Sequence, residues 1–283
     1  MKVLSDPSSM RAWSRSHRTA GSSIGFVPTM GALHAGHEAL VERALGECDR
    51  VVLSIFVNPA QFNVASDFDR YPRTMDADLS IAERLGVHAV YAPSVEVVYA
   101  PGHSVMVEPG TASMPMEGAG RPGHFRGVAT IVAKLFHTVE PDSAFFGRKD
   151  YQQLAVVRQM VKDLDMDVTI VGIDTVREPD GLALSSRNVR LLPEHRSQAP
   201  VIKRALDQVA RAADSGERSV DVLKAHGMDV IAGAADCRLE YLEISDVDTL
   251  APLAEIDSSA VVCVAAWFGD VRLIDNVVVS VRS

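Results

Sequence analysis

The chain has 283 residues, 47% of them apolar, and a formal net charge of −9 at pH 7. This length allows one large domain or two modest ones, and the acidic balance argues against a surface that neutralises nucleic-acid phosphates. Three well-separated cysteines favour buried thiols in a reducing cytosol over a disulfide framework or zinc site. No apolar run reaches the ~18 residues of a membrane span. We therefore expect a cytoplasmic protein without nucleic-acid or membrane partners.

In the first part of the chain, short apolar runs alternate with amphipathic segments. Strands are predicted at 23–27, 50–57, 87–91, 143–146 and 168–173, and helices at 38–48, 75–85, 127–139 and 150–164. Strands separated by such helices predict a doubly wound, parallel, Rossmann-like sheet that binds ligands beyond the carboxyl ends of its strands. Between 101 and 126, many Gly and Pro residues predict a long loop or a pair of short strands.

The pattern changes after residue 175. Helices are predicted at 194–214 and 219–232, and strands at 238–244, 260–267 and 271–279, the last two joined as in a hairpin. We therefore expect a Rossmann-like domain over 1–175. A smaller α+β domain with an antiparallel sheet, placed as a lid, is expected over 176–283.

The segment 24–37 joins a strand to a helix through a loop that contains Gly31 and Gly36 and includes His34 and His37. Free backbone N–H groups and the helix dipole would attract an anion to such a loop, and glycine permits its close approach. Three interpretations of the two histidines are open. They can be metal ligands, although no third-ligand motif is present, or they can merely cap and pack the helix start. As a third choice, they donate hydrogen bonds to a phosphate whose negative charge grows in the transition state.

Two further clusters combine charge with a loop or a helix start. Lys149 would place a cation at a helix N-terminus, Asp150 could bond a ribose hydroxyl, and Gln153 lies one helical turn further on. The segment Leu184-Ser-Ser-Arg187 has the groups of a mobile phosphate clamp. Each cluster, taken alone, is also typical of a solvated surface.

Neutral amides and single charged residues complete the candidates. Asn58 and Gln61 follow the second strand and could orient a hydroxy acid without adding charge. Arg121, in the long loop, could pair with a carboxylate. Asp78 could reach a Mg²⁺ that ATP phosphates hold, although acidic residues early in a helix usually just favour its dipole.

Six motifs in order resemble those of the pantothenate synthetase (pantoate–β-alanine ligase) family, within the HIGH-motif nucleotidyltransferase superfamily. The motifs are Pro28-Thr-Met-Gly-Ala-Leu-His-Ala-Gly-His37, Ser54-Ile-Phe-Val-Asn-Pro59 with Gln61-Phe62, Tyr71-Pro-Arg-Thr74, Arg121-Pro-Gly-His-Phe125, Lys149-Asp-Tyr-Gln-Gln153, and Val176-Arg-Glu178 with Leu184-Ser-Ser-Arg-Asn188. The resemblance implies ATP-dependent condensation of (R)-pantoate with β-alanine through pantoyl adenylate, with release of AMP and pyrophosphate. It also implies Mg²⁺ with the nucleotide and a homodimer joined through the N-terminal domain.

The alternative is a nucleotidyltransferase of the same superfamily that acts on another small substrate. Such an enzyme transfers a nucleotide to a phosphorylated alcohol and stops there. It would lack the pairing of Gln61 with Gln153, which the resemblance assigns to pantoate.

The resemblance also implies roles by position. Catalytic roles fall on His37, His34 and Lys149. The ATP site would comprise Met30, Gly31, Ala32, Leu33, His34, Ala35, Gly36, His37, Gly147, Arg148, Lys149, Asp150, Val176, Leu184, Ser185, Ser186 and Arg187. Gln61 and Gln153 would hold pantoate, with Asn58 and Arg121 added to the substrate site. Two positions depart from the family pattern: Arg148 stands where an acid or Gln is common, and Ala77 where some relatives carry an acid, which leaves Asp78 for the metal.

Overall fold

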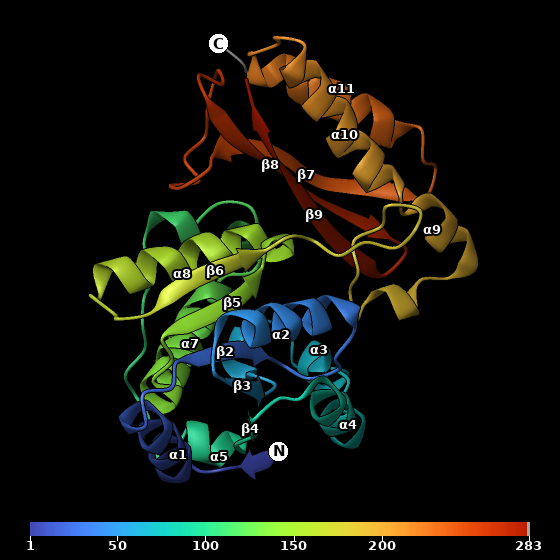
Figure 1. The fold of residues 1–283 in the computed structure, drawn as a ribbon. Coiled ribbons are helices and arrows are strands. Elements are labelled where there is room, and N and C mark those ends of the chain that lie inside the picture. The colour runs from blue at the N-terminus through green and yellow to red at the C-terminus, as the bar shows by residue number, and fades with distance from the viewer. Residues whose placement is uncertain (282–283) are drawn as a thin grey trace.

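A six-stranded parallel sheet forms the centre of the N-terminal domain in the computed structural model, which describes residues 1–281 apart from the side chains of residues 65 and 66 (Figure 1). In spatial order its strands are β1 (Lys2–Leu4), β4 (Ala89–Tyr91), β3 (Arg50–Ile55), β2 (Ile24–Thr29), β5 (Ser143–Gly147) and β6 (Thr169–Ile173). From the β2–β5 pair the chain order runs outward through β3 and β4 on one side and to β6 on the other, while β1 pairs with β4 at the edge. The sheet is therefore doubly wound, as predicted, and its switch point lies between β2 and β5.

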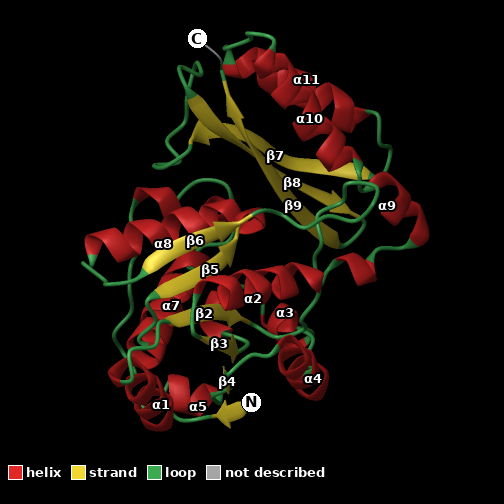
Figure 2. Cartoon of the chain, viewed as in Figure 1, coloured by secondary structure: helices red, strands yellow, loops and turns green. Residues whose placement is uncertain are grey.

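Helices cover both faces of this sheet (Figure 2). They are α2 (Ala35–Glu47) and α4 (Met75–Leu85) on one face, and α1 (Pro7–Thr19), α7 (His124–Val139) and α8 (Tyr151–Asp163) on the other. Neighbouring residues Phe26 and Val27 of β2 enter opposite cores, as do Phe145 and Phe146 of β5. Side chains alternate along a strand, so burial on both faces explains the continuous apolar runs. Among the described residues, no helix combines the length and apolar composition needed to cross a membrane.

The C-terminal domain contains a second, antiparallel sheet in the order β7-β8-β9, which confirms the predicted α+β class. Its elements are α9 (Pro193–Gln198), α10 (Val201–Asp214), α11 (Val220–Ala232), β7 (Cys237–Asp246), β8 (Ser259–Phe268) and β9 (Val271–Ser280). Val262 and Val264 of β8 pack in the core with α10 and α11. Val261 and Cys263, on the opposite face, join the core that contains α7 and α8. The smaller sheet is thus seated on the N-terminal domain by apolar contact.

The segment 101–126 is the predicted long loop and contains no strand. It holds only short turns, η2 (Thr111–Ser113) and α6 (Glu117–Gly120). Gln152, buried on α8, fixes this loop: its Oε1 accepts from the backbone N–H of Glu117 at 3.0 Å, and its Nε2 donates to the carbonyls of Ala112 and Pro115 at 3.0 and 2.7 Å. The loop therefore has one definite path to the start of α7.

Several elements differ from the sequence prediction. The polar N-terminus forms β1 and α1, which begins with Asp6 as its cap and Pro7 as its first residue. The predicted helix 194–214 is two helices, because Pro200 between α9 and α10 has no N–H to continue the first. The short elements η1 (Pro59–Gln61), α3 (Ala65–Asp69), α5 (Val95–Val98), η3 (Arg148–Asp150) and η4 (Asn188–Arg190) were not predicted.

Gly127 allows α7 to approach η1 closely. A Cβ atom at Gly127 would lie 2.2 Å from the carbonyl oxygen of Ala60 and 2.7 Å from the nitrogen of Gln61. We expect Gly127→Ala to lower the free energy of unfolding by about 1–3 kcal/mol, the usual cost of overpacking. Gly46→Ala, on the exposed side of α2 with nothing within 4 Å, should be neutral or stabilising by up to ~1 kcal/mol. Urea unfolding measures both, and a wild-type midpoint for Gly127→Ala would contradict the close approach.

Candidate active site

A cleft of about 260 Å³ opens beyond the carboxyl ends of β2, β3 and β5, beside the switch point. The segments 174–176 and 184–187 close its other side. The residues of the predicted site that line this cleft are Met30, His34, Gly36, His37, Asn58, Gln61, Arg121, Gly147, Lys149, Asp150, Gln153, Val176, Leu184, Ser185, Ser186 and Arg187. The fold therefore brings most of the predicted side chains to one place.

The remaining predicted residues do not line the cleft: Gly31, Ala32, Leu33, Ala35, Asp78 and Arg148. The resemblance assigns Arg148 to the ATP site, but its side chain is engaged elsewhere. Its guanidinium forms an ion pair with Asp174 at 3.1 Å, so its charge is largely offset. Its carbonyl accepts a hydrogen bond from Asn276 of β9 at 2.9 Å.

Asp78 holds the loop after β2 rather than facing the cleft. The backbone N–H groups of Ala32 and Leu33 donate to its two carboxylate oxygens at 3.0 and 2.8 Å, and the Thr74 hydroxyl donates at 3.1 Å. Only 1% of Asp78 is exposed. Two corrections follow: these loop N–H groups are not free for an anion, and the carboxylate is not available to a metal ion.

His34 and His37 lie at the start of α2 with their rings 4.1 Å apart, centroid to centroid. The Nδ1 atom of His34 accepts from the backbone N–H of Gly36 at 3.1 Å, and Nδ1 of His37 accepts from that of His34 at 3.3 Å. A neutral imidazole that accepts at Nδ1 carries its hydrogen on Nε2. Each ring therefore offers one Nε2–H donor.

The protonation of both rings supports this arrangement. Burial, with the neighbouring His34, lowers the pKa of His37 to about 3. Burial and the nearby Lys149 lower the pKa of His34 as well. Near neutral pH the pair therefore acts as two uncharged hydrogen-bond donors, and it does not add positive charge to the cleft.

Positive charge comes instead from Lys149 and Arg187, which both act on the carboxylate of Asp150. Lys149 Nζ lies 3.7 Å from Asp150 Oδ1, and 17% of the lysine side chain is exposed. Desolvation raises the pKa of Asp150, whose side chain is still 49% exposed, but the charges of Lys149 and Arg187 outweigh it and hold that pKa below its usual range. The cleft thus combines the cations of Lys149, Arg187 and Arg121 with the ionised carboxylate of Asp150 and the uncharged imidazoles of His34 and His37.

Asn58 and Gln61 make different contacts although they are close in sequence. The Asn58 amide donates to Gln61 Oε1 at 3.0 Å and to the Gly127 carbonyl at 3.1 Å, and its Oδ1 accepts from the Tyr99 hydroxyl at 2.7 Å. Both N–H bonds of Asn58 are thereby used, which does not support the predicted substrate contact. Gln61 Nε2 contacts Met30 Sδ at 3.2 Å and keeps a second N–H for another acceptor.

The structure adds His124 and Tyr71, which both line the cleft and were not among the predicted site residues. His124 Nδ1 lies 2.9 Å from the Gln61 carbonyl, and burial together with Arg121 lowers its pKa to about 4. Tyr71 lies beside Ser186 and Arg187. His124 belongs to the motif that begins at Arg121, and Tyr71 begins the motif that follows Gln61 in the chain. Their membership in these motifs was the sequence feature that could have identified them.

No group of three or more His, Cys, Asp or Glu side chains with the arrangement of a metal site occurs within residues 1–281 as far as they are described. The His34–His37 pair therefore lacks the further protein ligands that a resident metal ion would require. The observed contacts are those of the capping interpretation, because both Nδ1 atoms accept backbone N–H groups at the start of α2. The Nε2–H groups that remain are compatible with the phosphate interpretation, which stays a prediction.

The low pKa of His37 predicts that stability falls in acid. The unfolded chain takes up a proton on this ring near its ordinary pKa of 6.5, and the folded chain only near 3. Between these values the unfolded state binds more protons, so the free energy of unfolding falls as pH falls, by up to about 1.4 kcal/mol per pH unit for this ring.

Urea unfolding between pH 7 and 4 measures this slope. His37→Asn, which has no titrating ring, should show a shallower slope than wild type. His226→Asn, at an exposed position of α11, should retain the wild-type slope. Equal slopes for His37→Asn and wild type would mean that the folded protein protonates His37 normally.

Comparisons with known proteins agree along the whole chain. A family model described as Pantoate-beta-alanine ligase matches residues 2–278. The pantothenate synthetase of Chloroflexus aggregans is 50% identical over 266 residues, which cover 94% of this chain and 96% of that protein. The crystal structure of pantothenate synthetase from Thermus thermophilus is 46% identical, with a TM-score of 0.91 over 98% of this chain and 99% of that one.

A third relative was solved with ligands. The pantoate-beta-alanine ligase of Francisella tularensis, complexed with beta-gamma ATP and beta-alanine, is 33% identical, with a TM-score of 0.80 over 98% of this chain and 97% of that one. Sequence, family model and fold agree over nearly the full length. The chain belongs to the pantoate-beta-alanine ligase family.

Proposed function

We propose that this chain condenses (R)-pantoate with β-alanine to give pantothenate, using ATP and forming pantoyl adenylate as the intermediate. One observation carries the proposal: two Nε2–H imidazole donors and Lys149 share a cleft with Gln61 and Gln153. The imidazole donors and Lys149 fit a phosphate, whereas the amides of Gln61 and Gln153 fit an uncharged substrate or a carboxylate. The ligands bound to the Francisella tularensis relative, beta-gamma ATP and beta-alanine, support the same reaction.

In the first step, a carboxylate oxygen of pantoate attacks the α-phosphate of ATP, and pyrophosphate leaves. Negative charge builds on the phosphate oxygens as the new bond forms. His34 and His37 would donate hydrogen bonds from their Nε2–H groups to those oxygens, and Lys149 would neutralise part of the charge. Such donors are fixed before the reaction and need no reorganisation, which makes them effective at lowering a barrier.

Pantoate would be held by Gln61 and Gln153. Among the residues that the structure describes, none accepts from the second side-chain N–H of Gln61, and Gln153 lies on the first turn of α8 at the cleft wall. Amides can bind both a carboxylate and hydroxyl groups because each has donors and an acceptor. In the second step the amine of β-alanine attacks the acyl carbon of the adenylate and AMP leaves.

ATP would occupy the side of the cleft formed by Met30, Gly147, Asp150, Val176 and the segment 184–187. Asp150 is ionised and suits a ribose hydroxyl, whereas Ser185, Ser186 and Arg187 offer donors to phosphates.

We assign the boundary between the two domains to residues 175 and 176. The segment 184–187 is then the part of the C-terminal lid domain that lines the cleft. The last two residues of the second domain lie outside the described part of the chain.

Mg²⁺ would enter with the nucleotide. The described side chains do not form a metal cage, and Asp78 is engaged by three donors. Mg²⁺ often keeps its waters and binds mainly to substrate phosphates. In this proposal the ion screens phosphate charge and the protein contributes no dedicated ligand set.

A pantoate-dependent ATP–pyrophosphate exchange assay tests substrate and first step together. We expect exchange in the wild type only when pantoate is present, and AMP release only when β-alanine is added as well. His37→Ala and Lys149→Ala should each reduce exchange by at least ~10²-fold, the scale for losing a transition-state donor.

Lys162→Ala, an exposed lysine at the far end of α8, is the matched control and should exchange at the wild-type rate. Exchange that does not need pantoate would favour the superfamily nucleotidyltransferase instead. Unchanged single-turnover rates in both active-site variants would refute the roles given to His37 and Lys149.

We also propose a homodimer joined through the N-terminal domain. A groove beside α5 and α7 is lined by Val97, Val98, Val105, Met106 and Val107, and Val105 is 79% exposed. Apolar surface of this kind is typical of an interface with another protein surface. Light scattering at micromolar concentration should give twice the chain mass of 30.5 kDa, and Val105→Asp should shift the mass to that of one chain. A wild-type monomer would refute the dimer.

A further inference from the structure

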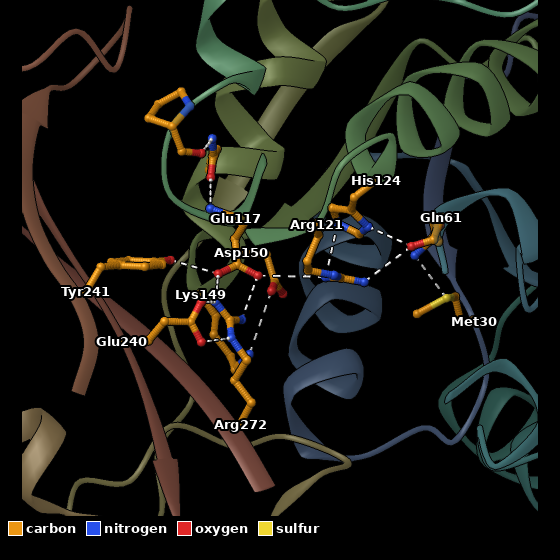
Figure 3. Close-up of polar contacts among 12 residues, drawn as sticks. Met30, Gln61, Glu117, Arg121, His124, Lys149, Asp150, Glu240, Tyr241 and Arg272 are labelled. Carbon is orange, nitrogen blue, oxygen red and sulfur yellow. Dashed lines mark hydrogen bonds and ion pairs between the residues drawn. The ribbon is translucent and has the colours of Figure 1, made fainter. Parts of the chain in front are cut away.

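Strand β9 of the C-terminal domain sends Arg272 across to the N-terminal domain (Figure 3). Arg272 donates to both carboxylate oxygens of Glu117 on α6, at 2.6 and 2.8 Å. The Tyr241 hydroxyl of β7 donates to the same carboxylate at 2.8 Å. Arg272 is held in turn by Glu240, at 2.8 and 2.9 Å. Paired donors and acceptors of this kind fix direction as well as distance.

This contact is shielded from water. The side chains of Arg272 and Glu117 are only 13% and 9% exposed. Burial alone raises the pKa of Glu117, but its hydrogen bonds and ion pair with Arg272 outweigh burial and hold it below its usual range. Glu117 therefore stays ionised and remains attached to β9. Breaking such a buried pair leaves an uncompensated charge, so the contact is difficult to loosen.

From Glu117 the contacts continue to the cleft. Arg121, one helical turn on, lies 3.7 Å from Glu117 and donates to His124 Nε2 and to the Gln61 carbonyl, both at 3.3 Å. A guanidinium only donates, so His124 Nε2 accepts and its Nδ1–H donates to the Gln61 carbonyl at 2.9 Å. Two donors thus converge on the backbone of Gln61.

The same strand reaches the opposite wall of the cleft. Asn276, four residues after Arg272 on β9, donates through Nδ2 to the carbonyls of Arg148 and Lys149 at 2.9 and 2.8 Å. Asn276 is 8% exposed. Neither Arg272 nor Asn276 lines the main cleft. Asn276 nevertheless holds the backbone of Lys149, which does line it, and Arg272 reaches the backbone of Gln61 through the side chains of Glu117 and Arg121.

We propose that β9 positions the two halves of the active site separately: Arg272, through Glu117, Arg121 and His124, places Gln61 for pantoate, and Asn276 places Lys149 for the phosphate. This proposal rests on the function proposed above. Arg272 and Asn276 are positioning residues, because neither would touch a substrate. The seating of the C-terminal domain would then determine both substrate affinity and the rate of adenylate formation.

The test compares two variants by steady-state ATP–pyrophosphate exchange. Arg272→Lys keeps the charge but loses the paired geometry; it should raise KM for pantoate about tenfold and change KM for ATP less than about twofold. Asn276→Ala should lower the maximal exchange rate about tenfold and leave KM for pantoate within about twofold. Gln153→Ala supplies the reference for a loss specific to pantoate.

Arg238→Lys is the matched control, because Arg238 lies exposed on β7 of the same sheet and stacks on Trp267. It should behave as wild type. If Arg272→Lys does not fold, as judged by circular dichroism, Tyr241→Phe removes only one hydrogen bond to Glu117 and should raise KM for pantoate about two- to threefold.

A double variant separates positioning from a general loss of stability. Arg272→Lys combined with Arg121→Lys should raise KM for pantoate little more than the larger single change, since both act on Gln61 through one path. Effects that multiply, or equal changes in the KM values of pantoate and ATP, would overturn the proposal. A wild type without pantoate-dependent exchange would instead refute the proposed function, so the two failures are distinguishable.

Discussion

The buried carboxylate of Asp78 determines how the loop after β2 is folded. It accepts from two successive backbone N–H groups, those of Ala32 and Leu33, and so bends the chain where Gly31 and Ala32 adopt positive φ angles of 80° and 51°. Two fixed oxygens can hold this strained turn because they satisfy donors that would otherwise be buried without partners. The turn delivers His34 to the N-cap of α2, and the rest of the site is built around the two histidines.

The electrostatics of the cleft divide the work between charge and hydrogen bonding. The chain is acidic overall, so an anionic nucleotide must be attracted by local groups rather than by the general field. Lys149, Arg187 and Arg121 supply that charge on three different segments. The histidines remain neutral because desolvation and a nearby cation lower their pKa values. As uncharged donors, they can hydrogen-bond to a phosphate without first taking up a proton.

The C-terminal domain contributes more to the site than a cover. Its apolar face joins the core around α7 and α8, and its polar residues make directional contacts at the edges of that face. Arg272 of β9 pairs with Glu117 of the N-terminal domain at 2.6 and 2.8 Å. Apolar burial supplies most of the association energy, whereas this ion pair fixes the relative position of the two domains.

The sequence by itself determined the succession of strands and helices, the two fold classes and most of the residues that line the cleft. It could do so because hydrophobic periodicity and motif spacing are local properties, and because the carboxyl ends of parallel strands must meet at one edge. Only the tertiary structure decided which polar groups are still free. The Asn58 amide is hydrogen-bonded to Gln61, Gly127 and Tyr99. The Asp78 carboxylate is bonded to the loop after β2, and the Arg148 guanidinium forms an ion pair with Asp174. His124 and Arg272 gained their importance in the same way, because a hydrogen-bond partner distant in sequence is chosen by packing and leaves no periodic signal along the chain.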